Sequence, residues 1–172
     1  MASVEPYAPD VQVFLDIDGV LLGLDRERPQ RLALADHALD FLSFLLARAT
    51  VHWLSPGHRE AKAALDHLLV HTRQSDRERL LSLAPRVRMA SWRTLRTEAL
   101  PSDGRFLWLD DAPSPDELAA LRQRGWLERW MWVDTREEPE DLLRAQRVLA
   151  TRLPAPAGRP TPCWRRTSQR SA

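Results

Sequence analysis

Short apolar runs alternate with segments of helical spacing along most of this chain, and this alternation restricts the folds that it can adopt. The apolar runs predict β-strands at residues 11–16, 50–55, 86–90, 105–113 and 129–135. Helical spacing predicts helices within residues 37–49, 59–71, 76–84, 91–100, 114–125 and 138–153. Such alternation is typical of a parallel sheet that is covered by helices on both faces. We therefore expect an α/β fold with about five parallel strands, formed by a single domain over residues 8–153.

Carboxylates stand at the ends of two of these predicted strands. The run VFLDIDGVLL places Asp16 and Asp18 just before a glycine, and the fourth strand ends in Asp110 and Asp111. Ligands of parallel α/β sheets bind outside the carboxyl ends of the strands, so these groups and Ser55, at the end of the second strand, should share one crevice. Buried carboxylates are costly unless they are paired or bind a metal ion. An all-oxygen ligand set favours Mg²⁺.

The overall composition excludes several classes of protein. Hydrophobic residues make up 44% of the chain and charged residues 28%, and the formal net charge is +1. These values do not indicate a membrane protein or a strongly basic nucleic-acid binder. The first residues, MASVEPYAPDVQ, contain no apolar signal core, so we expect a cytoplasmic protein. Cys163 is the only cysteine, which excludes an intramolecular disulfide.

The last part of the chain, residues 154–172, is rich in proline, serine and arginine and has no apolar periodicity. This composition predicts a disordered tail. Its arginines could contact nucleic acid, although a solvated tail is the simpler interpretation.

Three segments together resemble motifs I, II and IV of the haloacid dehalogenase (HAD) superfamily: FLDIDGV, VHWLS and FLWLDD, in this order. The resemblance covers roughly residues 11–135. The segment ASWRTLRTEALPSDGRFLWLDDAP further resembles a group of short HAD-like chains with a W…LKTEAI…WLDD pattern. The resemblance implies a HAD-like Rossmannoid sheet with the strands in the order fifth, fourth, first, second, third. The connection between Ser55 and Arg96 is too short for a large cap domain.

The resemblance also implies a Mg²⁺-dependent phosphohydrolase that acts through an aspartyl-phosphate. Asp16 would be the nucleophile. Asp18 would be the general acid and base, and its backbone carbonyl would contact the metal. Gly19 would let the chain turn close to the phosphate, and Ser55 would donate a hydrogen bond to a phosphoryl oxygen. The substrate would be a phosphorylated molecule of unknown size, and no oligomeric state is predicted.

Metal ligands and a cation complete the site that the resemblance implies. Asp110 and Asp111 would hold Mg²⁺ directly or through water. Motif III normally supplies a lysine that stabilises the nucleophile and the phosphate, and here Arg96 occupies that position in LRTEAL. On the resemblance alone, lysine at position 96 would support the reaction at least as well as arginine. If Arg96 has this role, its side chain should lie within reach of Asp16; Arg93 and Lys62 are the alternative cations.

Two other functions are compatible with these residues. The replacement of lysine by Arg96 suggests a degenerate HAD-like module that binds metal or phosphate and regulates without turnover. A phospho-receiver domain also uses aspartates at strand ends, but receivers place the adjacent acidic pair after the first strand, whereas here the pair is Asp110 and Asp111. The receiver interpretation is therefore the weakest of the three.

Several histidine and tryptophan residues have less certain positions. His58 follows motif II directly and could face the site, although a solvated residue in the first turn of a helix is the favoured interpretation. Trp53, Trp108 and Trp132 lie in predicted strands and are expected in the core. Trp126 and Trp130 are expected to pack between a helix and a strand rather than to form an exposed patch.

Overall fold

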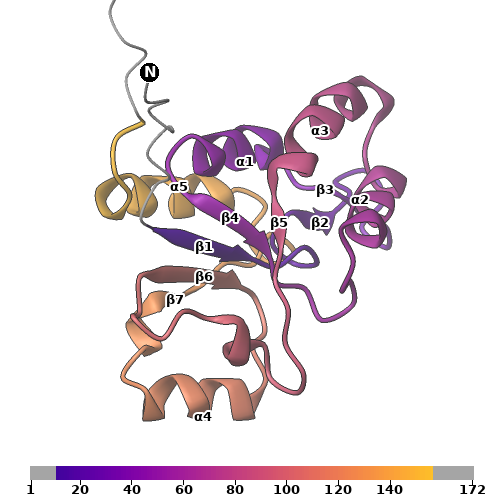
Figure 1. Cartoon of the computed structure of the whole chain (residues 1–172). Helices are drawn as coiled ribbons and strands as arrows, with labels where there is room; N and C mark the ends of the chain where they lie inside the picture. Colours follow the sequence, from indigo (N-terminus) through magenta and orange to yellow (C-terminus); the bar gives the residue numbers. More distant parts are fainter. Residues whose placement is uncertain (1–10, 157–172) are drawn as a thin grey trace, which may run out of the picture.

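A computed structural model describes residues 11–156 and shows an α/β fold around a five-stranded parallel sheet (Figure 1). The strands of this sheet are β1 (Gln12–Leu15), β4 (Thr50–Trp53), β5 (Arg88–Met89), β6 (Phe106–Asp110) and β7 (Trp130–Trp132). They are arranged in the order β5-β4-β1-β6-β7, and every pair of neighbours is parallel. The predicted fold class and the predicted strand order are confirmed, and β1 lies at the centre.

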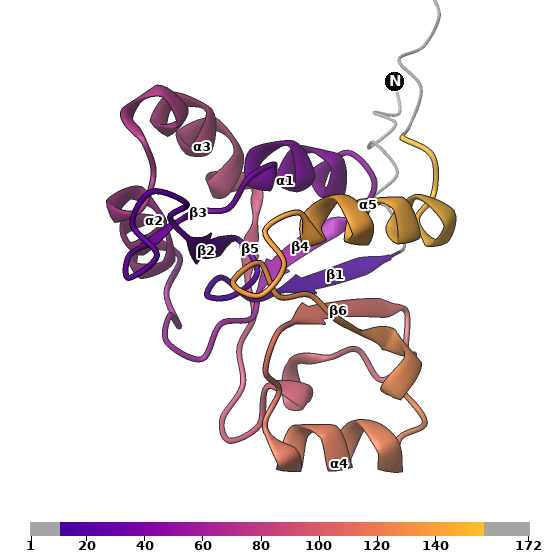
Figure 2. The same cartoon turned by 180° about the vertical axis from the view of Figure 1, so that it is seen from behind.

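Helices cover both faces of the sheet. The α-helices are α1 (Ala38–Leu46), α2 (Ala61–Val70), α3 (Arg77–Leu83), α4 (Pro115–Gln123) and α5 (Asp141–Arg152). Short 3₁₀ helices are η1 (Gln74–Asp76), η2 (Ala84–Arg86), η3 (Arg96–Ala99) and η4 (Leu127–Arg129). Helices α1 and α5 pack on one face and α4 on the other, as the two opposite views show (Figures 1 and 2).

Alternation along the central strand divides the core between the two faces. Val13 and Leu15 belong to the larger apolar cluster, which includes buried residues of α1, α3 and α5. Phe14, between them, belongs to the smaller cluster with Trp108 and with Leu121 of α4. Successive side chains of a strand point to opposite faces, so a strand buried on both faces reads as a continuous apolar run.

The predicted helix over residues 91–100 is wrong. Only η3 (Arg96–Ala99) is helical in this segment, and Leu95 before it has an extended backbone. The reason is the carboxylate of Glu98, which accepts hydrogen bonds from the backbone N–H groups of Arg93 and Leu95 at 2.9 and 3.1 Å. These bonds fold the preceding residues into a turn, so a longer helix does not form.

An unpredicted hairpin lies between the central strand and the first helix. Strands β2 (Leu22–Leu24) and β3 (Leu32–Leu34) form a separate two-stranded antiparallel sheet. The backbone N–H of Leu34 donates to the carbonyl of His71, next to the end of α2. The structure shows no large cap domain among the described residues, in agreement with the short connections in the sequence.

The tryptophans follow the prediction in most cases. Trp53 and Trp108 are buried, but Trp132 is 44% exposed, so its predicted core position is wrong. Strand β7 is at the edge of the sheet, and Trp132 points outward while Met131 beside it is buried. Trp126 packs edge-on against Phe106 at a ring-centroid distance of 5.2 Å, which agrees with the predicted packing role.

Two sequence predictions fall wholly or partly outside the described residues. The predicted disordered tail at 154–172 lies beyond residue 156 except for its first residues, and the predicted domain start at residue 8 lies before the first described residue. No helix in the described part of the chain is long and apolar enough to cross a membrane.

Candidate functional site

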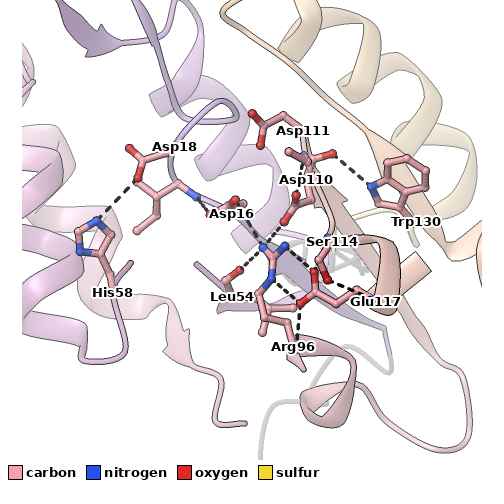
Figure 3. A network of polar contacts seen from close by, with 12 residues as sticks. Asp16, Asp18, Leu54, His58, Arg96, Asp110, Asp111, Ser114, Glu117 and Trp130 are labelled. Carbon is pink, nitrogen blue, oxygen red and sulfur yellow. Dashed lines mark hydrogen bonds and ion pairs between the residues drawn. The ribbon is translucent and has the colours of Figure 1, made fainter. Parts of the chain in front are cut away.

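The carboxyl ends of the three central strands bring the candidate residues to one edge of the sheet (Figure 3). Asp16 directly follows β1, Asp110 ends β6, and Ser55 comes two residues after β4. The backbone N–H of Asp16 donates to the carbonyl of Leu109 at 3.0 Å. Because the neighbouring strands run parallel and in register, residues far apart in the sequence meet at this edge.

Asp16, Asp110 and Asp111 form what we call the carboxylate cluster. One oxygen atom from each side chain lies within 4.8 Å of the others. Burial, together with the nearby charge of Asp110, raises the pKa of Asp16 well above its usual range. Burial is also the main reason that the pKa of Asp110 is raised to about 6 and that the pKa of Asp111 is raised. Ionised carboxylates in this arrangement require positive charge nearby.

Arg96 supplies buried positive charge to this cluster. Its Nη1 donates to the carboxylate of Asp110 and lies 3.6 Å from Oδ2 of Asp16, so the expected proximity of Arg96 to Asp16 is present. The guanidinium group also lies over the ring of Trp108, 5.0 Å from its centroid. Burial alone would lower the pKa of Arg96, but its carboxylate partners, above all Glu117, raise it. Arg96 therefore keeps its charge beside Asp16.

Glu117, which the sequence analysis did not identify, holds Arg96 in place. Its two carboxylate oxygens accept hydrogen bonds from Nε and Nη2 of Arg96, both at 2.9 Å. The backbone N–H of Arg96 donates to the same carboxylate at 3.0 Å, and that of Ser114 at 2.8 Å. Burial opposes ionisation of Glu117, but the bonds from Arg96 and Ser114 outweigh it and lower its pKa.

The sequence indicates one part of this arrangement, the pairing of Glu117 with Ser114 at the start of α4. Ser114 caps α4 and Glu117 is the third residue of that helix, so the two form a capping box. The pattern Ser-x-x-Glu before a helix predicts this cap. It does not predict that the same Glu117 carboxylate also binds an arginine 21 residues earlier in the chain.

Gly19 permits the close approach of two loops. Its φ of 82° lies in the left-handed region, and a β-carbon at this position would overlap the carboxylate of Asp111. The carbonyl of Gly19 accepts hydrogen bonds from the backbone N–H and the hydroxyl of Thr135, at 2.8 and 3.1 Å. Arg136, next to Thr135, lies 3.4 Å from Asp111. The loop after β7 therefore supports the loop after β1.

Ser55 is completely buried next to the carboxylate cluster. Its hydroxyl favours the ionised form of Asp16 and so counteracts the rise in the pKa of that group. Its Oγ nevertheless forms no hydrogen bond of ordinary geometry within the described residues. A buried hydroxyl without such a partner has a donor that could be used by a bound anion.

The side chain of Asp18 does not join the carboxylate cluster. It points toward His58, away from Asp16, as Figure 3 shows. Its Oδ1 lies 2.8 Å from Nε2 of His67, and its Oδ2 lies 3.9 Å from Nε2 of His58. The favoured interpretation of His58 as a solvated helical residue is wrong, because α2 begins only at Ala61 and the His58 side chain is 17% exposed.

The alternative cations lie away from the cluster or on the surface. Lys62 is exposed and pairs with Asp66 one turn further along α2. Arg93 is exposed in the turn before η3. Of the three basic residues considered, Arg96 is the one that the fold places beside Asp16.

The carboxylate cluster fits a metal ion. Its donor atoms are all oxygens, two of its three residues are buried, and the pKa values of all three are raised. A divalent cation would stabilise the ionised carboxylates and so offset the burial that is the main cause of the raised pKa values. Hard divalent cations select such oxygen ligands.

A comparison with protein-family models finds no match to this chain, and a comparison with curated protein sequences finds none either.

Proposed function

We propose that this protein is a Mg²⁺-dependent phosphohydrolase that acts through an aspartyl-phosphate on Asp16. The observation that carries the proposal is the position of Asp16 at the end of the central strand, beside two further carboxylates and 3.6 Å from a buried guanidinium group. The resemblance of the three motifs to the HAD superfamily supports the same chemistry.

Each residue has a distinct role in the proposed reaction. An oxygen of Asp16 attacks the phosphorus atom, the bond from phosphorus to the leaving oxygen breaks, and Asp18 gives that oxygen a proton. Asp18 then takes a proton from a water molecule, whose oxygen attacks phosphorus. The bond between phosphorus and Asp16 breaks, which releases inorganic phosphate and restores the carboxylate.

Charge stabilisation comes from Arg96 and from the carboxylate cluster. Arg96, which lies 3.6 Å from Asp16, and the buried hydroxyl of Ser55 would donate hydrogen bonds to phosphoryl oxygens. Asp16, Asp110 and Asp111 would hold Mg²⁺, together with the backbone carbonyl of Asp18. When bound, Mg²⁺ would shield the negative nucleophile from the negative phosphate.

In the proposed reaction, the leaving group would lie on the side to which the Asp18 side chain points. Its carboxylate faces His58 and His67. The leaving group should therefore lie on the side of Asp16 where the two histidines are found. No large cap domain encloses the site, so the proposal admits bulky substrates such as phosphoproteins or nucleic-acid ends.

A phosphate-release assay over a broad substrate panel with Mg²⁺ tests the proposal. Asp16→Asn should abolish release, whereas Asp116→Asn, which changes an exposed carboxylate on α4, should leave it unchanged. Equal activity of wild type and Asp16→Asn would refute the nucleophile assignment.

One observation favours a second candidate, a module that binds metal or phosphate without turnover. Nη1 of Arg96 donates to a carboxylate oxygen of Asp110 and so competes with a metal for that ligand. Absence of phosphate release over the whole panel, with Mg²⁺ still bound in calorimetry, would favour this candidate.

A further inference from the structure

A second group of metal-ligating side chains lies beside the proposed active site. Asp18, His58 and His67, which we call the histidine cluster, each offer one ligand atom, and these atoms lie within 4.8 Å of one another. All three residues are partly exposed. None of the three side chains belongs to the carboxylate cluster.

The fold places these side chains together from three separate segments. Asp18 follows the central strand, and His67 lies on α2. His58 is held by the turn after β4, in which its backbone N–H donates to the carbonyl of Ser55. The rings of His58 and His67 stack with centroids 4.2 Å apart, and Nε2 of each ring faces the carboxylate of Asp18.

A third histidine supports this arrangement without offering a ligand to it. The ring of His71 contacts that of His67 edge-on at a centroid distance of 5.0 Å. Nδ1 of His71 lies 3.2 Å from the carbonyl of Leu32 in β3. The unpredicted hairpin therefore fixes the end of α2 on which His67 stands.

We propose that Asp18, His58 and His67 bind a divalent transition-metal ion of the Zn²⁺ type, at a site separate from the carboxylate cluster. Two imidazole nitrogens and one carboxylate oxygen are the ligands of open, three-residue Zn²⁺ sites and of related sites for other transition metals. The partial exposure of the three residues leaves a further coordination position open to water or a ligand.

The distances suit such an ion after small shifts. Ligand atoms of a tetrahedral site with bonds of about 2.0–2.1 Å lie roughly 3.3 Å apart. Nε2 of His67 lies 2.8 Å from Oδ1 of Asp18, and Nε2 of His58 lies 3.9 Å from Oδ2 of the same carboxylate, one separation shorter and one longer than this value. A simple hydrogen-bonded pair would account for His67 but not for His58, because 3.9 Å is too long for a hydrogen bond.

The donor types distinguish the two clusters. The carboxylate cluster offers oxygen only and suits a hard cation, whereas imidazole nitrogen suits Zn²⁺ and other transition metals. Binding of a transition-metal ion to the histidine cluster does not require the proposed phosphohydrolase activity. If that activity is present, an ion on Asp18 would occupy the carboxylate that proton transfer requires, and Zn²⁺ would inhibit.

Titration of the metal-free full-length protein with Zn²⁺ in a calorimeter, in the presence of excess Mg²⁺, tests the site. His67→Ala and His58→Ala should each weaken Zn²⁺ binding more than the roughly 10- to 100-fold that loss of a supporting residue causes. His71→Ala is the matched control because it removes a neighbouring imidazole that is not a ligand, and it should weaken binding less than either variant.

A second measurement identifies the ligands directly. Co²⁺ added in place of Zn²⁺ should give visible absorption bands typical of nitrogen ligation, and these should be lost in the His58→Ala/His67→Ala variant but kept in Asp110→Asn. Circular dichroism of each variant verifies folding. Zn²⁺ binding that survives in the double histidine variant and is lost in Asp110→Asn would overturn the proposal, as would a wild type that binds no Zn²⁺.

Discussion

Replacement of Glu117 by alanine should destabilise the protein strongly, because this carboxylate holds a buried cation. It accepts hydrogen bonds from Nε, Nη2 and the backbone N–H of Arg96, at 2.9, 2.9 and 3.0 Å. Removal of one partner from a buried ion pair costs about 3–5 kcal/mol. Arg96 keeps its contacts with Asp110 and Asp16, so we expect the lower end, about 3 kcal/mol. For a chain of this length, this loss corresponds to a decrease in Tm of roughly 6–12 °C.

Urea denaturation followed by circular dichroism measures the effect. Glu117→Gln retains an acceptor oxygen without the charge and should fall between wild type and Glu117→Ala. Glu128→Ala is the control, because Glu128 is exposed and pairs with Arg129 only at 3.8 Å. Pairs of this kind contribute about 0–1 kcal/mol. A Glu117→Ala variant no less stable than Glu128→Ala would refute the argument that this pair holds Arg96.

Three further predictions concern the carboxylate cluster. Because burial raises the pKa of Asp110 from 3.8 to about 6, its folded form binds the proton more tightly than the unfolded form, so metal-free protein should lose stability as the pH rises through this range. Thermal melting as a function of pH, with and without Mg²⁺, measures this loss of stability, and Asp110→Asn should make the stability depend less on pH. Gly19→Ala should weaken Mg²⁺ binding in calorimetry, because its β-carbon would displace Asp111; unchanged affinity would contradict this. Arg96→Ala should lower phosphate release about 10²- to 10³-fold and Arg93→Ala far less, while Arg96→Lys, contrary to the expectation from resemblance, should also lower it.

The geometry around Arg96 explains why lysine should not replace it, although the resemblance to the HAD motif favours lysine at this position. The structure shows that the guanidinium group donates to Glu117 through two nitrogens and to Asp110 through the third. A lysine ammonium is a single point charge and cannot reproduce this planar, bidentate arrangement.

The class of fold and the location of the carboxylate cluster can be predicted from the amino-acid sequence alone. The alternation of apolar runs and helical segments is a local property, and it predicted the parallel sheet. Asp16 and Asp110 stand at strand ends, so their meeting follows from the rule that parallel strands end at one edge. Ser55 and Arg96 were also identified, and the structure places both beside Asp16.

The groups that complete the site become evident only when the elements are packed against one another. Glu117 contacts Arg96, 21 residues away in the sequence, and His67 contacts Asp18, 49 residues away. Neither separation follows from the period of a strand or a helix. His67 and His71 are four residues apart at the end of α2, a recognisable pattern, but the sequence contains no indication that His67 faces Asp18 whereas His71 faces the carbonyl of Leu32. Local periodicity assigns a side chain to one face of its own element. The partner on another element depends on how the elements pack, which is a property of the whole chain.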